Sequence, residues 1–400
     1  MIPYGKHFLD EDDIQEVIDI LRNGTLTQGI KVDEFEERFS SYVGSKYAIA
    51  VSSGTAALHL ACLAKDISKG DNVITSANTF VSDANCAVFV GANPLFTDID
   101  VESLNMSPQD LASKCQQNKK MRAIIPAHFA GVPCDMVPIK EVADKYKSII
   151  IEDACHALGA KYPCGAKVGS CKYSDITVFS LHPVKSIATG EGGMITTNDD
   201  ETYRRLIMLR SHGIFHQKLF KNPNFHMDKL FVNEDRAYDE KGVTPWYFEM
   251  QELGFNYRLS EIQCGLGISQ LRKLDRFIEY RKKLVGKYDQ AFLGIDNLSI
   301  TQIKYRSTSA FHLYVVRINF RNIGISRAEF MRKLGVLGVG SQVHYIPIPS
   351  HPFYEKRGFS LDNYINTKTY YDEGLSLPLY YELSETEQDL VVKSVLSILS

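Results

Sequence analysis

The stretch 179-FSLHPVKSIATGEGGMITT-197 sets a single lysine between two runs of β-forming residues. The first run is Ile176 to Phe179, and the second, Met194 to Thr197, follows a glycine cluster at 190–193. Lys185 is therefore held in a connection that leaves the end of a strand. We interpret it as an amine positioned to form a Schiff base with an aldehyde, in contrast to the solvated lysines of a protein surface.

Working outward from this stretch, short β-branched runs alternate with amphipathic helical patterns from about residue 45 to 200. Strands are expected at 47–51, 72–75, 95–98, 123–126, 149–152, 176–180 and 193–197, and helices at 55–65, 81–90, 108–115 and 139–147. Such alternation predicts an α/β fold with a mostly parallel central sheet covered by helices. Ligands of such sheets bind at the carboxyl ends of the strands.

Beyond residue 200 the pattern changes. Residues 215–247 are polar and are expected to form an exposed arm. The C-terminal half is expected to contain a long helix from Ser260 to about Ala291, strands at 310–319 and 342–346, and helices at 327–334 and 385–399, the last with a capping box of Ser384 and Glu387. We predict a large domain over 1–260 and, over 261–400, the long connecting helix with a smaller α+β domain.

Composition excludes several classes of protein. The 400 residues carry a net charge of −3 and are 44% hydrophobic, which is typical of a soluble globular protein and gives no support for binding to nucleic acid or to a membrane surface. No apolar run approaches the roughly 20 residues that cross a bilayer, and residues 1–6 lack the apolar segment of a signal peptide. The eight cysteines form no C-x-x-C pair. We therefore expect a cytoplasmic protein with reduced thiols and no metal site.

Two polar features of the large domain fit one ligand. Asp153 ends the β-type run 148–152, so its carboxylate can point into the ligand crevice, where it would hold a protonated pyridine nitrogen. The alternative for Asp153 alone is a helix cap or an ion pair. The loop 52-SSGTAA-57 joins a strand to a helix, and Gly54 and Thr55 can hold a phosphate at the helix N-terminus, although simple N-capping would use the same residues.

Three further side chains complete the set. Phe80 can place its ring on a planar ligand, and His156 can contact the opposite face; taken singly, each is more often a packing residue. Ser180, at the end of a strand, is a further phosphate ligand. Together with Lys185 and Asp153, and in this chain order, these residues predict a pyridoxal 5′-phosphate site.

At this point the chain resembles the DegT/StrS family of nucleotide-sugar aminotransferases, which are fold-type I pyridoxal phosphate enzymes. The matching stretches extend over nearly the whole chain: Leu26-Thr27-Gln28-Gly29, Ser53 to Leu58, Gly91 to Pro94, Ile151 to Ala154, the Lys185 segment, Gly190 to Gly193, Gly254 to Leu259 and Gln342 to Tyr345. The resemblance implies that Lys185 forms the Schiff base and that Asp153 pairs with the ring nitrogen. It also assigns Gly54, Thr55 and Ser180 to the phosphate, and Phe80 and His156 to the two faces of the ring.

The resemblance carries a further implication for assembly. In this family the segment around Asn256 reaches the active site of a neighbouring subunit and touches the phosphate there. It therefore implies a homodimer with shared active sites; the alternative is an asparagine buried within its own chain.

Two departures from the family pattern stand out. His156 occupies a position where many members carry glutamine, and residues 79–85 read Thr-Phe-Val-Ser-Asp-Ala-Asn where many show Thr-Phe-x-Ala-Thr-Ala-Asn. Neither removes a group that the chemistry needs. Family members that act as dehydratases replace the Schiff-base lysine by histidine, so Lys185 favours transamination.

Within the family, the runs at 156–159, 210–213, 249–254 and 342–347 are similar to those of enzymes of pseudaminic acid biosynthesis. The resemblance then implies transfer of an amino group from L-glutamate to C4 of a UDP-linked 4-keto-6-deoxy-N-acetylhexosamine. It assigns substrate contacts to Tyr4, Thr25, Leu26, Thr27, His312, Leu313, Tyr314 and His344. The rival interpretations are amination of another keto-sugar nucleotide (at C3 or C4, dTDP- or GDP-linked) and a regulator that merely binds the cofactor.

Overall fold

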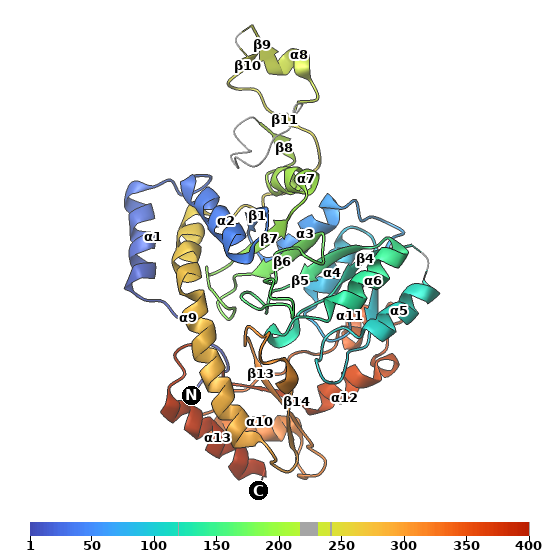
Figure 1. Ribbon diagram of the computed structural model, residues 1–400, viewed down its shortest axis with the longest axis vertical. Helices are drawn as coiled ribbons and strands as arrows, with labels where there is room; N and C mark the ends of the chain where they lie inside the picture. Colours follow the sequence, from blue (N-terminus) through green and yellow to red (C-terminus); the bar gives the residue numbers. More distant parts are fainter. Residues whose placement is uncertain (119, 217–230, 241, 400) are drawn as a thin grey trace.

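The computed structural model describes residues 1–118, 120–216, 231–240 and 242–399. A seven-stranded sheet lies at the centre of the molecule in the order β1-β7-β6-β5-β4-β2-β3 (Figure 1). Its strands are β1 (Tyr47–Val51), β2 (Asn72–Ser76), β3 (Asn93–Thr97), β4 (Met121–Ile125), β5 (Ile149–Asp153), β6 (Ile176–Ser180) and β7 (Gly193–Thr197). Strands β2 to β6 pair in parallel, and β7 is antiparallel to both neighbours. The predicted α/β fold is confirmed, and every predicted strand of this sheet is present within two residues of its expected bounds.

Helices cover both faces of the sheet. They are α1 (Glu11–Asn23), α2 (Ile30–Val43), α3 (Gly54–Ala64), α4 (Ser82–Phe89), α5 (Pro108–Gln117), α6 (Met136–Tyr146), α7 (Asp200–Arg210) and α9 (Glu261–Phe292). Alternate strand residues enter two separate cores: in β1, Tyr47, Ile49 and Val51 pack with α3 and α7, whereas Ala48 and Ala50 pack on the side of α2 and α9. Burial on both faces explains why the strands read as continuous apolar runs.

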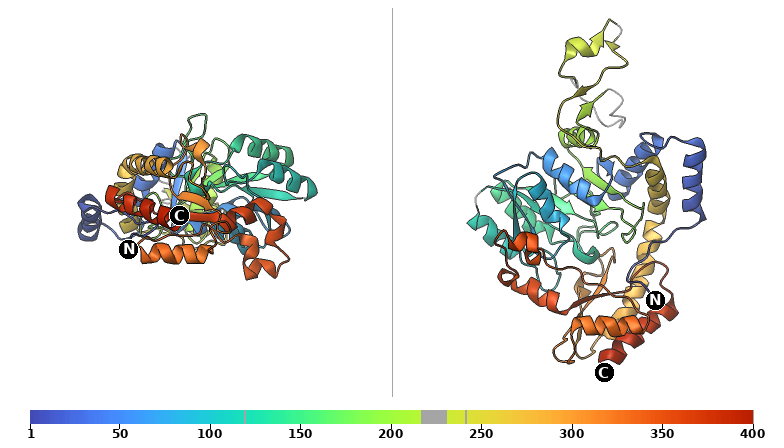
Figure 2. Two further views of the ribbon diagram at one scale, coloured as in Figure 1. Left: turned by 90° about the horizontal axis from the view of Figure 1, so that it is seen from below. Right: turned by 180° about the vertical axis from the view of Figure 1, so that it is seen from behind.

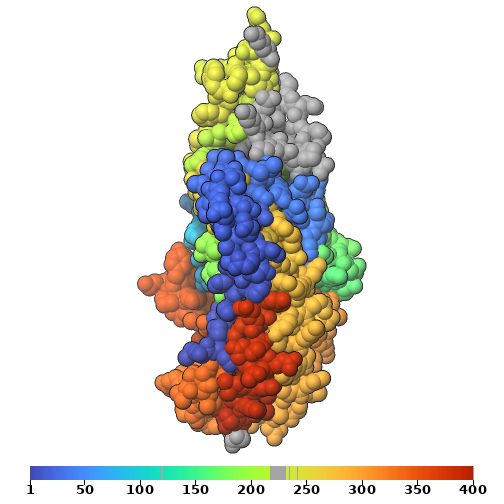
Figure 3. Space-filling view, turned by 90° about the vertical axis from the view of Figure 1, so that its left-hand side faces the viewer, coloured from blue at the N-terminus to red at the C-terminus, as the bar shows by residue number. Residues whose placement is uncertain are grey.

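Helix α9 connects the sheet to a smaller C-terminal part, as Figure 2 shows from two further sides. That part contains the antiparallel strands β12 (Leu298–Ile300), β13 (Tyr314–Ile318) and β14 (Gly374–Leu377) with helices α10 (Arg327–Val336), α11 (Pro352–Glu355), α12 (Ile365–Glu373) and α13 (Glu385–Leu399). The predicted capping box is confirmed, because Ser384 Oγ accepts from the Glu387 N–H and the Glu387 carboxylate accepts from the Ser384 N–H. Helices α1, α9 and α13 share one face of the molecule (Figure 3).

The strand expected at 342–346 is wrong. Only Gln342 forms a β-bridge, with Ser376 in β14. Farther along, the Tyr345 N–H donates to the side chain of Asn78 (3.3 Å) and not to a neighbouring strand. His344 and Tyr345 therefore line a cavity and do not extend a sheet.

The first residues of the chain belong spatially to the C-terminal part. Ile2 pairs with Val339, and the Leu379 N–H donates to the Tyr4 carbonyl (3.1 Å). The division of the chain at residue 260 stays a prediction, and we propose that residues 1–5 join the smaller unit.

The arm predicted at 215–247 projects from the large part of the molecule (Figure 1). At its base β8 (Ile214–Phe215) pairs with β11 (Glu249–Met250), and farther out lie α8 (Glu234–Ala237), β9 (Tyr238–Asp239) and β10 (Gly242–Val243). Residues 217–230 and 241 of the arm lie outside the described residues. The described part is less polar on its surface than expected, because Val232, Tyr238 and Trp246 are exposed. Among the described residues, we find no helix with the length and apolarity to cross a membrane.

Candidate active site

A cavity of about 430 Å³ opens at the carboxyl ends of β1, β5 and β6 and is closed on the other side by the C-terminal part. Most of the residues predicted from the sequence meet here. Those that line it are Tyr4, Gly54, Thr55, Phe80, Asp153, His156, Ser180, Lys185, His312, Leu313 and His344. The structure thus brings together residues that lie up to 340 positions apart in the sequence, because Tyr4 and His344 line the same cavity.

Lys185 lies in the loop that follows β6, and its backbone N–H donates to the His182 carbonyl (2.8 Å) to form a turn. Burial in the cavity lowers the pKa of the Lys185 amine, and the nearby Cys155, Asp153 and Asp83 oppose this shift. A lysine with a lowered pKa is more often neutral, and only the neutral amine is a nucleophile.

Asp153 is the last residue of β5 and is buried. Its Oδ1 accepts from the Cys155 N–H (2.8 Å), and its carbonyl accepts from the His128 N–H (3.0 Å). These bonds fix the backbone and one carboxylate oxygen. The carboxylate therefore enters the cavity in a defined orientation, as a partner for a cationic ring nitrogen requires.

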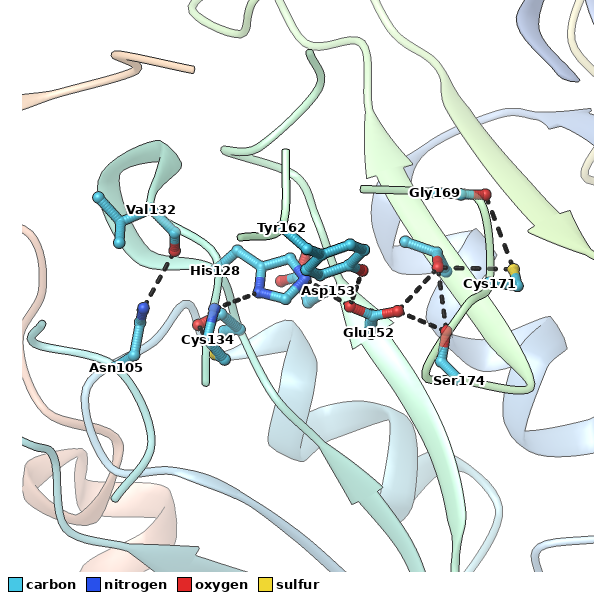
Figure 4. A network of polar contacts seen from close by, with 12 residues as sticks. Asn105, His128, Val132, Cys134, Glu152, Asp153, Tyr162, Gly169, Cys171 and Ser174 are labelled. Carbon is cyan, nitrogen blue, oxygen red and sulfur yellow. Dashed lines mark hydrogen bonds and ion pairs between the residues drawn. The ribbon is translucent and has the colours of Figure 1, made fainter. Parts of the chain in front are cut away.

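Behind Asp153, the preceding residue Glu152 anchors a buried polar network (Figure 4). Its carboxylate accepts from His128 Nε2 (2.7 Å), Tyr162 (2.5 Å) and Ser174 (2.5 Å). Burial alone would raise the pKa of Glu152, but these hydrogen bonds outweigh it and lower the pKa. Because successive strand residues point to opposite faces, this network holds the end of β5 from the side away from the cavity.

The tautomer of His128 follows from its two partners. The Cys134 N–H donates to Nδ1 (3.0 Å), so Nδ1 carries a lone pair and the ring proton lies on Nε2, facing Glu152. His128 therefore accepts at Nδ1 and donates from Nε2 to the Glu152 carboxylate.

One end of the cavity is suited to a phosphate. Gly54 and Thr55 are the first two residues of α3, whose first-turn N–H groups have no partner within the helix. A Cβ on Gly54 would lie 3.1 Å from the Cβ of Ser180, and one on Gly193 would lie 2.5 Å from the carbonyl carbon of Ser53. Only glycine leaves this junction between β7 and α3 open, so the backbone can approach a bound anion.

Imidazole and phenol rings form the opposite wall. The ring of His156 lies 4.2 Å from that of His312, and its Nε2 is 2.8 Å from the Tyr345 hydroxyl. The Ala130 N–H donates to His156 Nδ1 (3.3 Å), so His156 is the Nε2–H tautomer and donates to Tyr345. Phe80 is half exposed at the mouth, 5.9 Å from the Tyr345 ring.

Three histidines that line the cavity, His156, His312 and His344, are neutral. Burial is the main cause that lowers the pKa of His156 and of His312 well below the usual range, and the charge of Lys185 adds to it. For His344 the same two causes lower the pKa to about 3. Within the described part of the chain, His312 Nδ1 has no hydrogen-bond partner, which leaves it available for a polar group of a substrate.

Five predicted residues do not line this cavity. Thr25, Leu26 and Thr27 lie on the exposed connection between α1 and α2. Tyr314 is buried in the C-terminal part, where its hydroxyl donates to Asp289 (3.0 Å), so its position fits packing and not substrate contact. Asn256 forms a β-bridge with Ser211 and does not line the cavity of its own chain.

Sequence reasoning assigned no role to several residues of the site. Tyr345 stood in a matched stretch, but only the fold shows its contact with His156. Cys155 follows Asp153 by two positions and lines the cavity. Asp83 was noted only as a departure from the family pattern, and its neighbours are described below. Among the described residues, no group of three or more His, Cys, Asp or Glu side chains is arranged to hold a metal ion.

The side chains of the cavity fit pyridoxal phosphate. They offer an acid for the ring nitrogen, an amine for the aldehyde and a helix N-terminus for the phosphate. A fold of this type with such a site defines a pyridoxal phosphate-dependent aminotransferase.

Comparisons with known proteins agree with this assignment to the aminotransferases. The profile of the DegT/DnrJ/EryC1/StrS aminotransferase family matches residues 7–396, and the chain belongs to this family of pyridoxal phosphate-dependent sugar aminotransferases. It is 37% identical over 399 residues to the spore coat polysaccharide biosynthesis protein SpsC of Bacillus subtilis (99% of this chain, 97% of the relative). It is 36% identical over 400 residues to the UDP-4-amino-4,6-dideoxy-N-acetyl-β-L-altrosamine transaminase of Campylobacter jejuni (100% and 98%). Among solved structures, the PLP form of the Streptococcus pneumoniae protein Spr1654 is similar with a TM-score of 0.86 at 28% identity (100% and 98%).

Proposed function

We propose that this enzyme transfers the amino group of L-glutamate to C4 of a UDP-linked 4-keto-6-deoxy-N-acetylhexosamine, the step found in pseudaminic acid biosynthesis. The observation that carries the proposal is the meeting of Lys185 and Asp153 in one enclosed cavity. The choice of sugar is supported by the 36% identity to the altrosamine transaminase over the whole chain.

In this proposal each residue has a defined task. Bound pyridoxal phosphate would supply an aldehyde and an electron-withdrawing ring. Asp153 keeps the proton on the ring nitrogen, and Lys185, once released from the cofactor, moves a proton between cofactor and substrate carbons. Gly54, Thr55 and Ser180 bind the phosphate.

The remaining assignments concern orientation of the ring and the substrate. Phe80 and His156 contact the two faces of the cofactor ring. Tyr4, His312, Leu313 and His344 line the part of the cavity where the sugar would lie. The half-exposed ring of Phe80 and the mouth beside it leave room for the nucleotide, whose binding energy serves orientation.

The proposal includes a homodimer in the cytoplasm with active sites shared through Asn256. The sharing of active sites between subunits is supported by Asn256, because this residue does not line the cavity of its own chain. The loop with Thr25, Leu26 and Thr27 is exposed in the single chain and is proposed to act on the substrate in the assembled enzyme.

The substrate is tested with purified enzyme, pyridoxal phosphate, L-glutamate and a panel of keto-sugar nucleotides. The panel contains 4-keto and 3-keto sugars on UDP, dTDP and GDP, and 2-oxoglutarate is measured as the common product. The highest kcat/KM is expected for the UDP-linked 4-keto-6-deoxy-N-acetylhexosamine. Preference for a 3-keto sugar or for another nucleotide would replace the substrate assignment and leave the enzyme class intact.

The role of Lys185 is tested by Lys185→Ala. We expect loss of the visible absorbance that wild-type enzyme acquires with the cofactor, and a fall in turnover of at least about a thousandfold, since a covalent link and a proton carrier are both removed. Lys283→Ala, at an exposed position of α9, serves as the matched control and should behave as wild type. Turnover that survives in Lys185→Ala contradicts the assigned role.

A further inference from the structure

A second carboxylic acid lies directly beside Asp153. Asp83, in α4, is fully buried, and its side chain is within hydrogen-bonding reach of the Asp153 carboxylate. Its Oδ2 accepts from the Thr79 hydroxyl (2.7 Å), whereas its Oδ1 has no donor among the described residues. Two neighbouring buried carboxylates do not both stay ionised, because their negative charges repel each other and no water screens them.

The hydrogen bonds decide which acid holds the proton. Asp153 Oδ1 already accepts the Cys155 N–H (2.8 Å), so this carboxylate serves as a hydrogen-bond acceptor. On Asp83 the Thr79 hydroxyl occupies Oδ2 as an acceptor, so a proton on Oδ1 turns the one unpartnered oxygen into a donor toward Asp153. Burial, followed by the charge of Asp153, raises the pKa of Asp83 well above its usual range, which agrees with this assignment.

No other group near Asp83 is a better proton holder. The titratable side chains that face it are Asp153 of β5, Cys155 of the loop after β5, Lys185 of the loop after β6, Cys86 of its own helix and Tyr345 of the C-terminal part. Burial raises the pKa of the Cys155 thiol and of the Tyr345 hydroxyl, so these groups stay neutral; the pKa of Cys86 is raised by its contact with Cys62 and by burial. Lys185 is the basic side chain of this set, and even when protonated it can balance only a single negative charge.

We propose that Asp83 is a neutral carboxylic acid that donates a hydrogen bond from Oδ1 to Asp153, and that it acts as a positioning residue by making Asp153 a weaker base toward the cofactor ring. This inference rests on the proposed role of Asp153. It also explains the departure at residue 83, because a protonated aspartate donates a hydrogen bond as the threonine hydroxyl of many family members can.

The test compares three substitutions of Asp83. Asp83→Asn keeps the shape, an acceptor for Thr79 and a donor for Asp153, but it cannot ionise. Asp83→Leu keeps the branching at Cγ and removes the donor. Asp83→Thr introduces a hydroxyl donor and serves as the second variant if Asp83→Leu folds poorly. The readout is the pH midpoint at which the visible absorbance of the bound cofactor changes, together with kcat/KM; near-ultraviolet circular dichroism confirms the fold.

We expect the midpoint of Asp83→Asn to stay within about 0.3 pH units of wild type. Asp83→Leu should raise the midpoint by about one unit, the size expected when an ionised group loses one hydrogen bond, because Asp153 then presents more negative charge to the ring. Its kcat/KM should fall about tenfold by the same reasoning, with recovery in Asp83→Thr. A midpoint lowered by a unit in Asp83→Asn would show that Asp83 is charged in the wild type, and an unchanged midpoint in Asp83→Leu would show that the hydrogen bond has no influence; either result overturns the proposal.

A second measurement separates this proposal from the proposed function. At pH 8, infrared difference spectra of the cofactor-free enzyme should show the carbonyl band of a protonated carboxylic acid, and Asp83→Asn should abolish it. This test needs no cofactor and no substrate. If the enzyme failed to bind pyridoxal phosphate through Lys185, the proposed function would fall, while the presence or absence of this band would still decide the protonation of Asp83.

Discussion

At the scale of the residue, the three cavity histidines couple stability to pH. His156, His312 and His344 are neutral in the folded protein because burial lowers their pKa values, whereas in the unfolded chain each titrates near 6.5. Below that pH the unfolded state binds more protons than the folded state. Stability is therefore fully present above about pH 6.5 and falls as the pH decreases, for His344 down to its folded pKa of about 3.

We expect the apparent Tm to fall between pH 7.5 and 5.5, with each histidine contributing up to about 1.4 kcal/mol per pH unit to the slope of the unfolding free energy. His344→Gln should reduce this pH dependence, because glutamine cannot titrate. His7→Gln changes an exposed histidine and is the control. Equal pH slopes for wild type and His344→Gln would show that His344 takes up a proton as readily in the folded protein as in the unfolded one.

Residues whose chemistry shows in the local sequence are predictable members of the site. Lys185 and Asp153 follow strands, and a strand end is a position that local pattern reveals. Asp83 and Tyr345 were not assigned, because their roles depend on Asp153 and His156, which lie 70 and 189 positions away along the chain. No local pattern reports such pairings.

At the scale of the element, one carboxylate joins two helices. Glu261, the first residue of α9, accepts from the N–H groups of Gly29 (3.0 Å), Lys31 (3.0 Å) and Val32 (3.1 Å) at the start of α2. Helix α2 has no side-chain cap of its own, so Glu261 caps it from a distance. The same bonds hold the end of the loop that carries residues 25–27.

Glu261→Ala should therefore destabilise the protein by about 2 kcal/mol, since charged hydrogen bonds to three buried or half-buried N–H groups are lost. Glu261→Gln, which keeps one acceptor oxygen, should recover part of the loss in apparent Tm. If residues 25–27 contact the sugar nucleotide, its KM should rise more than kcat falls in Glu261→Ala. An exposed glutamate of α9, Glu279, provides the control substitution Glu279→Ala.

The elements themselves were predictable where one physical pattern governs them. The strands of the central sheet are buried on both faces and are therefore continuous apolar runs in the sequence. Their bounds could be predicted from these runs. The segment 342–346 also suggests a strand, but its backbone is bonded to Asn78 and Ser376. The sequence pattern alone therefore predicted a strand where the structure has a cavity wall. Helices α1 and α2 were not predicted, because their apolar faces are completed by contact with α9.

At the scale of the whole molecule, the proposed sharing of active sites through Asn256 predicts complementation between two inactive variants. Lys185→Ala lacks the reactive amine, and Asn256→Asp would place a negative charge beside the phosphate of the neighbouring site. Mixed dimers would hold one site with both defects and one site with neither. After subunit exchange between equal amounts, activity should recover to about a quarter of wild type, because half of the dimers are mixed and each has one intact site. If every site lay within one chain, mixing would restore nothing.

The pairing of the first residues with the last third of the chain has a consequence for biosynthesis. Tyr4 lines the cavity, and its carbonyl is bonded to Leu379, while Ile2 pairs with Val339. Leu379 is synthesised long after Tyr4, so this wall of the pocket stays incomplete until the C-terminal part has emerged from the ribosome. The nascent chain can assemble its central sheet early, but its active-site pocket is complete only when the C-terminal part is in place.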